Sequence, residues 1–196
     1  MTPGAAGVGA RCERADLEQV AALLGRAPAG DLTVVLRSSD GAPAVIENAP
    51  FLRDGTPMPT RFWLVDPELR ASVSALESAG GVREAEAAVD AGALARAHAR
   101  YGAARDASIP AGHEGPRPSG GVGGTRSGVK CLHAHLAWWL VGGDDPVGAW
   151  VAARLGMQPG KRLEPQRESR RARRATRRAA VVARRRPAVS RQLLDS

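Results

Sequence analysis

Two short apolar segments joined by a tight turn constrain the fold of this chain most strongly. Residues 32–37 and 44–47 are rich in valine, leucine and isoleucine, and residues 38–41 between them have the Ser, Asp and Gly composition of a turn. Because a tight turn joins antiparallel neighbours, the two segments predict a β-hairpin. Residues 62–65 predict a third strand, and the three segments together predict a small antiparallel sheet.

Helical patterns surround and follow these strands. Asp66-Pro67 and Asp145-Pro146 each place a capping carboxylate before a proline, which is typical of a helix start. Asp16 is a third candidate cap. The spacing of apolar residues predicts helices over residues 17–24, 67–79, 82–89, 91–106, 129–141 and 146–155. A small antiparallel sheet packed against several helices is an α+β fold, and residues 110–128, rich in Gly and Pro, are expected to form a loop.

Charge is divided unevenly along the chain. Residues 160–196 hold 13 of the 28 lysines and arginines and 3 of the 20 acidic residues, a formal charge of +10, whereas residues 1–159 carry −2. We therefore expect a single α+β domain over residues 14–157, between a disordered N-terminus (residues 1–13) and an Arg-rich, disordered tail (residues 158–196). An alternative is that the tail binds nucleic acid or another polyanion through its phosphates, without aromatic residues to stack on bases.

The sequence also predicts the cellular compartment of the protein. No apolar stretch approaches the roughly 18 residues that a membrane span needs, and the N-terminus lacks the basic and apolar regions of a signal peptide. Cys12 and Cys131 are too few for a disulfide framework. We expect a cytoplasmic protein with reduced thiols and no membrane partner.

The best metal ligands of the chain are concentrated in residues 130–135. One of two cysteines, Cys131, and two of four histidines, His133 and His135, lie within five residues. On a helix, Cys131 and His135 share one face, whereas His133 points away. The pair suits two ligands of a divalent metal such as zinc, or a thiol beside a base. A buried cysteine beside a core histidine is the structural alternative.

A stripe on the helix predicted over residues 91–106 offers partners for this pair. His98, Tyr101 and Arg105 lie on one face at spacings of three and four residues. If that face packs opposite Cys131 and His135, His98 is a third metal ligand or a proton carrier, and Tyr101 and Arg105 bind an anionic ligand. Cys131, His135 and His98 are then the candidate catalytic residues. The alternative is a solvated helix face.

Two loops carry further candidates. Residues 123–130 lack the adjacent Gly-Lys-Ser/Thr of a phosphate-binding loop, so we exclude nucleotide hydrolysis by that route, but Lys130 beside a helix N-terminus can contact an anion. In residues 53–60, Pro57 and Pro59 stiffen a loop that can present Asp54 and Thr56 to a ligand. The alternatives are a flexible linker and a structural crossover.

Several of these segments together resemble a bacterial family known as domain of unknown function 501 (DUF501). The matching segments are residues 24–28, 54–60, 129–135 and 145–148. The resemblance extends over roughly residues 14–155 and leaves out the Arg-rich tail. It implies a compact cytoplasmic protein of high-GC Gram-positive bacteria, and it implies no activity.

Two functional hypotheses follow. The first is a cytoplasmic protein that binds a metal or a small anionic ligand at a Cys/His/Arg pocket, with its reaction and its status as an enzyme left open. The second is a non-catalytic interaction protein, whose body docks a protein partner and whose tail holds a polyanion.

Overall fold

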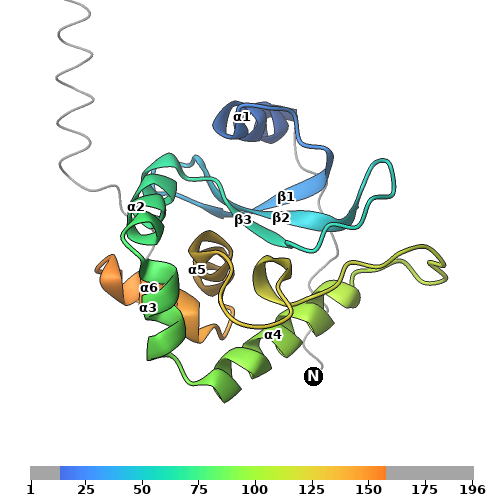
Figure 1. The fold of residues 1–196 in the computed structure, drawn as a ribbon. Helices are drawn as coiled ribbons and strands as arrows, with labels where there is room; N and C mark the ends of the chain where they lie inside the picture. Colours follow the sequence, from blue (N-terminus) through green and yellow to red (C-terminus); the bar gives the residue numbers. More distant parts are fainter. Residues whose placement is uncertain (1–13, 158–196) are drawn as a thin grey trace, which may run out of the picture. The chain divides into compact units, whose positions relative to one another are not determined.

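The computed structural model describes residues 14–157 of the chain, which form an α+β fold as the sequence predicts (Figure 1). In this part of the chain, three strands form one antiparallel sheet in the order β1-β2-β3. The strands are β1 (Gly30–Arg37), β2 (Pro43–Leu52) and β3 (Phe62–Leu64). The helices are α1 (Arg14–Leu24), α2 (Pro67–Ser78), α3 (Gly81–Ala88), α4 (Ala91–Asp106), α5 (Leu132–Leu140) and α6 (Pro146–Arg154), with a short 3-10 helix η1 (Val122–Gly124). Every described helix is too short or too polar to cross a membrane.

The predicted hairpin is present, but its second strand is longer than expected. β1 and β2 pair antiparallel, with Val34 opposite Ile46. The predicted strand ends at Glu47, whereas β2 continues to Leu52. The sequence does not predict this extension, because Asn48 and Pro50 are of residue types that are unfavourable in strands.

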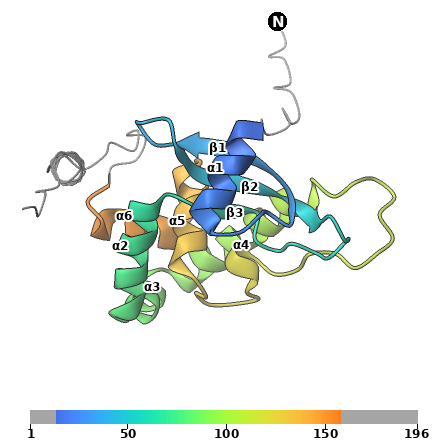
Figure 2. The ribbon, with the colours of Figure 1, turned by 90° about the horizontal axis from the view of Figure 1, so that it is seen from above.

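The sheet buries both of its faces. Neighbouring residues of a strand point to opposite faces, so Val45 and Ile46 enter different apolar clusters. Val45 packs with Leu64 and the helices α5 and α6, whereas Ile46 packs with Val20 of α1. Figures 1 and 2 show α1 over one face of the sheet and α5 against the other.

Helix α5 is the central element of the larger cluster. It packs against β3, α2 and α6, and six of its nine residues are buried. A helix buried on most of its surface needs apolar residues all round, and the sequence of α5 is dominated by Leu, Ala and Trp. Because α2 and α5 pack against each other, side chains at their ends can meet.

Two of the three expected helix caps are confirmed. Asp66 accepts a hydrogen bond from the backbone N–H of Leu69, and Asp145 accepts bonds at the start of α6. Asp16 is not a cap, because α1 already includes Arg14; its carboxylate instead pairs with Arg37 at 2.7 Å. The predictions made for residues 1–13 and 158–196 lie outside the described residues.

Candidate functional site

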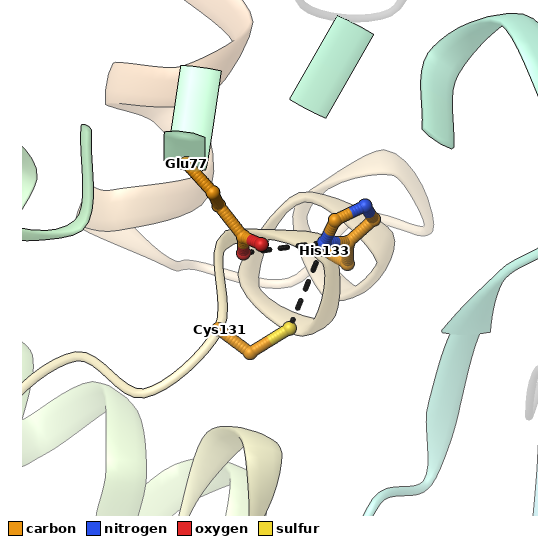
Figure 3. Close-up of side chains that lie close together, drawn as sticks. All are labelled: Glu77, Cys131 and His133. Carbon is orange, nitrogen blue, oxygen red and sulfur yellow. Dashed lines mark hydrogen bonds and ion pairs between the residues drawn. The ribbon is translucent and has the colours of Figure 1, made fainter. Parts of the chain in front are cut away.

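Cys131 lies immediately before α5, not within it. Its backbone is extended (φ −153°, ψ 117°), and the helix begins at Leu132, three residues after the predicted start. The expectation that Cys131 and His135 share a helix face is therefore corrected, because the four-residue relation holds only between helical residues. The Sγ atom of Cys131 lies 3.8 Å from Nδ1 of His133, the histidine that was expected to point away (Figure 3).

Glu77, near the C-terminal end of α2, completes this group. Its Oε1 accepts a 2.7 Å hydrogen bond from the backbone N–H of Leu132 and lies 3.2 Å from Nδ1 of His133. The carboxylate thus caps the N-terminus of α5, where backbone N–H groups lack partners within the helix and Cys131 provides no side-chain cap.

Glu77 is not among the site residues predicted from sequence, because it is far from Cys131 along the chain. One local signal was present: a negative charge in the last turn of a helix is unfavourable with the helix dipole, and the last turn of α2 contains no basic residue. An acid in that position suggests a partner elsewhere in the fold.

Three different ligand types converge at this point. The ligand atoms of Glu77, Cys131 and His133 all lie within 4.8 Å of one another. Carboxylate oxygen, thiolate sulfur and imidazole nitrogen are the ligands that zinc takes in proteins. All three residues are half-buried, so the group is sheltered but not sealed from solvent.

The other ring nitrogen of His133 is held by the protein. Nε2 lies 3.2 Å from the carbonyl oxygen of Arg70 and 3.2 Å from Oγ of Ser74. Since a carbonyl can only accept, Nε2 carries the proton, and Nδ1 faces Cys131 and Glu77. Histidines that bind metals usually donate their second ring N–H to a carbonyl or carboxylate in this manner.

The surroundings of His133 favour a positive charge. The hydrogen bond with Cys131 and the charges of Glu77 and Cys131 outweigh desolvation and raise the pKa of His133 to about 9. Without a metal, the imidazolium donates one proton toward Glu77 and the other toward Arg70. A metal cation held by Nδ1 would replace the first of these protons, so metal binding there would release protons.

Cys131 and His133 line a pocket with a volume of about 810 Å³. Its walls come from β3, α2, α5, η1 and the end of α1. The side chains around it include apolar Leu24, Phe62 and Trp63, the hydroxyl groups of Thr60 and Ser74, and the guanidinium groups of Arg26 and Arg70.

His135 lies in the core. Its side chain is fully buried, and Nδ1 is hydrogen-bonded to Oδ2 of Asp145 at 2.7 Å. The other carboxylate oxygen of Asp145 accepts from the backbone N–H groups of Val147 and Gly148 at the start of α6. Within the described residues, Nε2 of His135 has no hydrogen-bond partner. Through the hydrogen bonds of Asp145, His135 and Asp145 together connect α5 to the start of α6.

His98 is the neighbour of His135, as the predicted stripe on α4 implied. Their ring centroids are 5.7 Å apart. Nδ1 of His98 accepts from the backbone N–H of Val122, and Nε2 donates to the carbonyl of Gly128, so these bonds select the neutral ring. Desolvation by burial lowers the pKa of His98. The group of Glu77 and Cys131 does not include His98 or His135.

Tyr101 also faces the core rather than solvent. Its hydroxyl oxygen accepts hydrogen bonds from the backbone N–H groups of Arg61 (2.6 Å) and Phe62 (3.4 Å), and its ring packs edge-on against Trp138. Burial raises the pKa of Tyr101, so the phenol stays protonated. In this position Tyr101 joins α4 to the start of β3.

Arg105 is buried, and each nitrogen of its guanidinium has a polar partner. It donates to the carbonyl oxygens of Ser119 and Gly120, and its remaining nitrogens contact the carboxylate of Asp106. These bonds hold the loop after α4. Lys130 is exposed and does not line the pocket described above. The anion-binding roles of Arg105 and Lys130 remain predictions.

Asp54 and Thr56 form a local turn in the loop between β2 and β3. The backbone N–H of Thr56 donates to Oδ1 of Asp54 at 2.9 Å, and this bond lowers the pKa of Asp54. Both residues are exposed, and neither lines the pocket. From the same loop, Thr60 does line it.

Among the comparisons with known proteins, one family model matches the chain. The model of a family described as "Protein of unknown function (DUF501)" matches residues 34–153, more than half of the chain. Searches of curated proteins and of solved structures found no match.

Proposed function

The chain belongs to the DUF501 family. We propose that it binds a divalent metal ion, and that this ion is zinc, through Glu77, Cys131 and His133. The observation that carries this proposal is the convergence of three zinc-type ligand atoms within 4.8 Å, on two helices that are packed together. A thiolate ligand requires reduced cysteine, which fits the cytoplasmic location that we also propose.

The surroundings of the three residues support metal binding in two ways. Arg70 orients His133 through a carbonyl, and Leu132 orients Glu77 through a backbone N–H, so two ligands are held before any ion arrives. Three protein ligands beside a pocket are also typical of zinc sites that keep one coordination position for water or substrate. We assign no reaction to the site.

A metal-binding experiment tests the proposal directly. Protein purified without chelators should contain about one zinc per chain, and cobalt should produce the absorption of a thiolate-bound ion. Cys131→Ser and His133→Ala should each reduce the metal content and the cobalt absorption strongly. Cys12→Ser removes the other cysteine and should leave both unchanged.

A further variant distinguishes this ligand set from the one predicted from sequence. His98→Gln should keep the wild-type cobalt spectrum if Glu77, Cys131 and His133 are the ligands, and should alter it if Cys131, His135 and His98 are. Protein that binds no metal in any of these samples would overturn the proposal.

A specific observation favours one second candidate, a reactive thiol. Cys131 immediately precedes the N-terminus of α5, and its Sγ lies 3.8 Å from Nδ1 of His133, so a thiol and an imidazole are paired as they are in nucleophilic sites. In that case, metal-free protein should react with iodoacetamide at Cys131 faster than at Cys12, and His133→Ala should remove the difference. Equal rates at the two cysteines would argue against thiol chemistry.

A further inference from the structure

We propose that the pocket beside Glu77, Cys131 and His133 binds a small molecule that joins an oxyanion, either a carboxylate or a phosphate, to an apolar body. This inference rests on the proposed metal site for its place in the molecule. Its chemistry depends on other residues, Arg26, Arg70 and Trp63, and can therefore be tested separately.

Two arginines give the pocket a positive charge that no carboxylate of the described residues balances. Nη1 of Arg70 donates to the carbonyl oxygen of Leu23 at 3.0 Å, and the guanidinium of Arg26 lies over the ring of Trp63 at 5.7 Å. Within residues 14–157, neither arginine forms an ion pair with a carboxylate, and no aspartate or glutamate lines the pocket. A guanidinium with unused donors binds carboxylate or phosphate through paired hydrogen bonds.

The metal site does not neutralise these arginines. A divalent cation held by one thiolate, one carboxylate and a neutral imidazole gives a group with no net charge. The two guanidinium charges therefore remain when the metal is bound, and an anion entering the pocket is the group that can balance them.

The rest of the pocket selects for more than an inorganic ion. Its volume of about 810 Å³ lies within the range of roughly 300–1,000 Å³ that is usual for small-molecule sites. Leu24, Phe62 and Trp63 provide apolar surface next to the arginines. A ligand with only an oxyanion would leave this surface in contact with water, whereas an attached apolar group would cover it.

Calorimetric titration of the full chain tests the inference with defined probes. Phenyl phosphate and benzoate represent the two oxyanions, benzyl alcohol lacks the charge, and inorganic phosphate lacks the apolar group. We expect phenyl phosphate or benzoate to bind at least about tenfold more tightly than the last two probes. The anion that binds more tightly shows whether the pocket prefers a phosphate or a carboxylate.

Arginine variants supply the matched comparison. Arg26→Gln should weaken anion binding by about tenfold, because one charge-assisted contact is lost. Arg83→Gln, on the exposed surface of α3, should bind like wild type. Arg70→Gln should weaken binding as well. If circular dichroism shows that Arg70→Gln fails to fold, Arg26→Gln decides the question, since within residues 14–157 the exposed Arg26 side chain forms no hydrogen bond and contacts the ring of Trp63.

The results separate this inference from the proposed function. Benzyl alcohol binding as tightly as benzoate and phenyl phosphate, or unchanged affinity in Arg26→Gln, overturns the anion site even if zinc is bound. Arginine-dependent anion binding by protein that takes up no metal supports the anion site and overturns the metal site. Each titration is therefore run on metal-loaded and on chelator-treated protein.

Discussion

At the scale of single residues, the backbone of Cys131 decides which side chains form the site. An extended residue before a helix does not follow the helical repeat, so Sγ of Cys131 meets His133 instead of His135. His135 is left to the core, where Asp145 binds its Nδ1. The two histidines, two positions apart in sequence, therefore serve different parts of the molecule.

His98 leads to a prediction about pH. Its ring is held neutral between the N–H of Val122 and the carbonyl of Gly128, and burial lowers its pKa below the ordinary 6.5. The unfolded chain therefore takes up a proton here more readily than the folded protein does, so the free energy of unfolding should fall as the pH drops below about 6.5.

Chemical denaturation between pH 7.5 and pH 5 measures this effect. His98→Gln should have a lower free energy of unfolding at pH 7.5 and a smaller decrease on acidification than wild type. His113→Gln, in the loop after α4, should keep the wild-type decrease. An acid sensitivity that is the same in wild type and His98→Gln would contradict the role given to this ring.

At the scale of elements, the close approach of α5 and α6 supports the core around His135. A Cβ atom at Gly148 would lie 2.5 Å from the carbonyl oxygen of His135 and 2.5 Å from Cβ of Trp139. Neither is the flexible end of a long side chain, so the helices would have to move apart. The glycine thus allows α6 to begin directly against α5, where Asp145 binds His135.

Two glycine substitutions in helices test this packing. Gly148→Ala should lower the free energy of unfolding by about 1–3 kcal/mol, the usual cost of overpacking. Gly102→Ala in α4 is the matched control: its Cβ would lie 3.6 Å from the nearest atom, an ordinary contact, and the higher helix propensity of Ala should raise stability by up to about 1 kcal/mol. Urea unfolding of both variants gives the comparison, and stabilisation by Gly148→Ala would show that the helices separate easily.

At the scale of the whole molecule, the charge of the chain and the proposed site belong to different segments. Every residue of the proposed metal and anion sites lies within residues 14–157, whereas residues 160–196 carry a formal charge of +10. The pI of about 11.0 therefore says little about the ligand of the pocket.

Truncation after residue 157 tests this division. The shortened chain should keep the cobalt spectrum and the benzoate affinity of the full chain. If the basic segment binds polyanions, the full chain should bind duplex DNA at low salt and the shortened chain should not, because that segment supplies the counter-charge to phosphates and such binding weakens steeply with salt. DNA binding that survives the truncation would place the polyanion surface elsewhere.

The sequence by itself determined the kinds of elements, their order and several of their ends. The hairpin, the Asp66 and Asp145 caps and the limits of α4 depend on turn residues, capping groups and apolar periodicity within a few positions of each other, and the structure confirms them. The DUF501 resemblance, read from short segments of the chain, is confirmed too.

The tertiary structure alone decided which side chains meet. Glu77 reaches Cys131 and His133 because α2 and α5 pack together, and no local spacing encodes that contact. Helix α5 begins three residues later than predicted, so Cys131 is not helical and its side chain does not point in the direction that a helical wheel assigns to it. Periodicity determines the faces of an element, whereas a site between elements depends on where each one begins and on what it packs against.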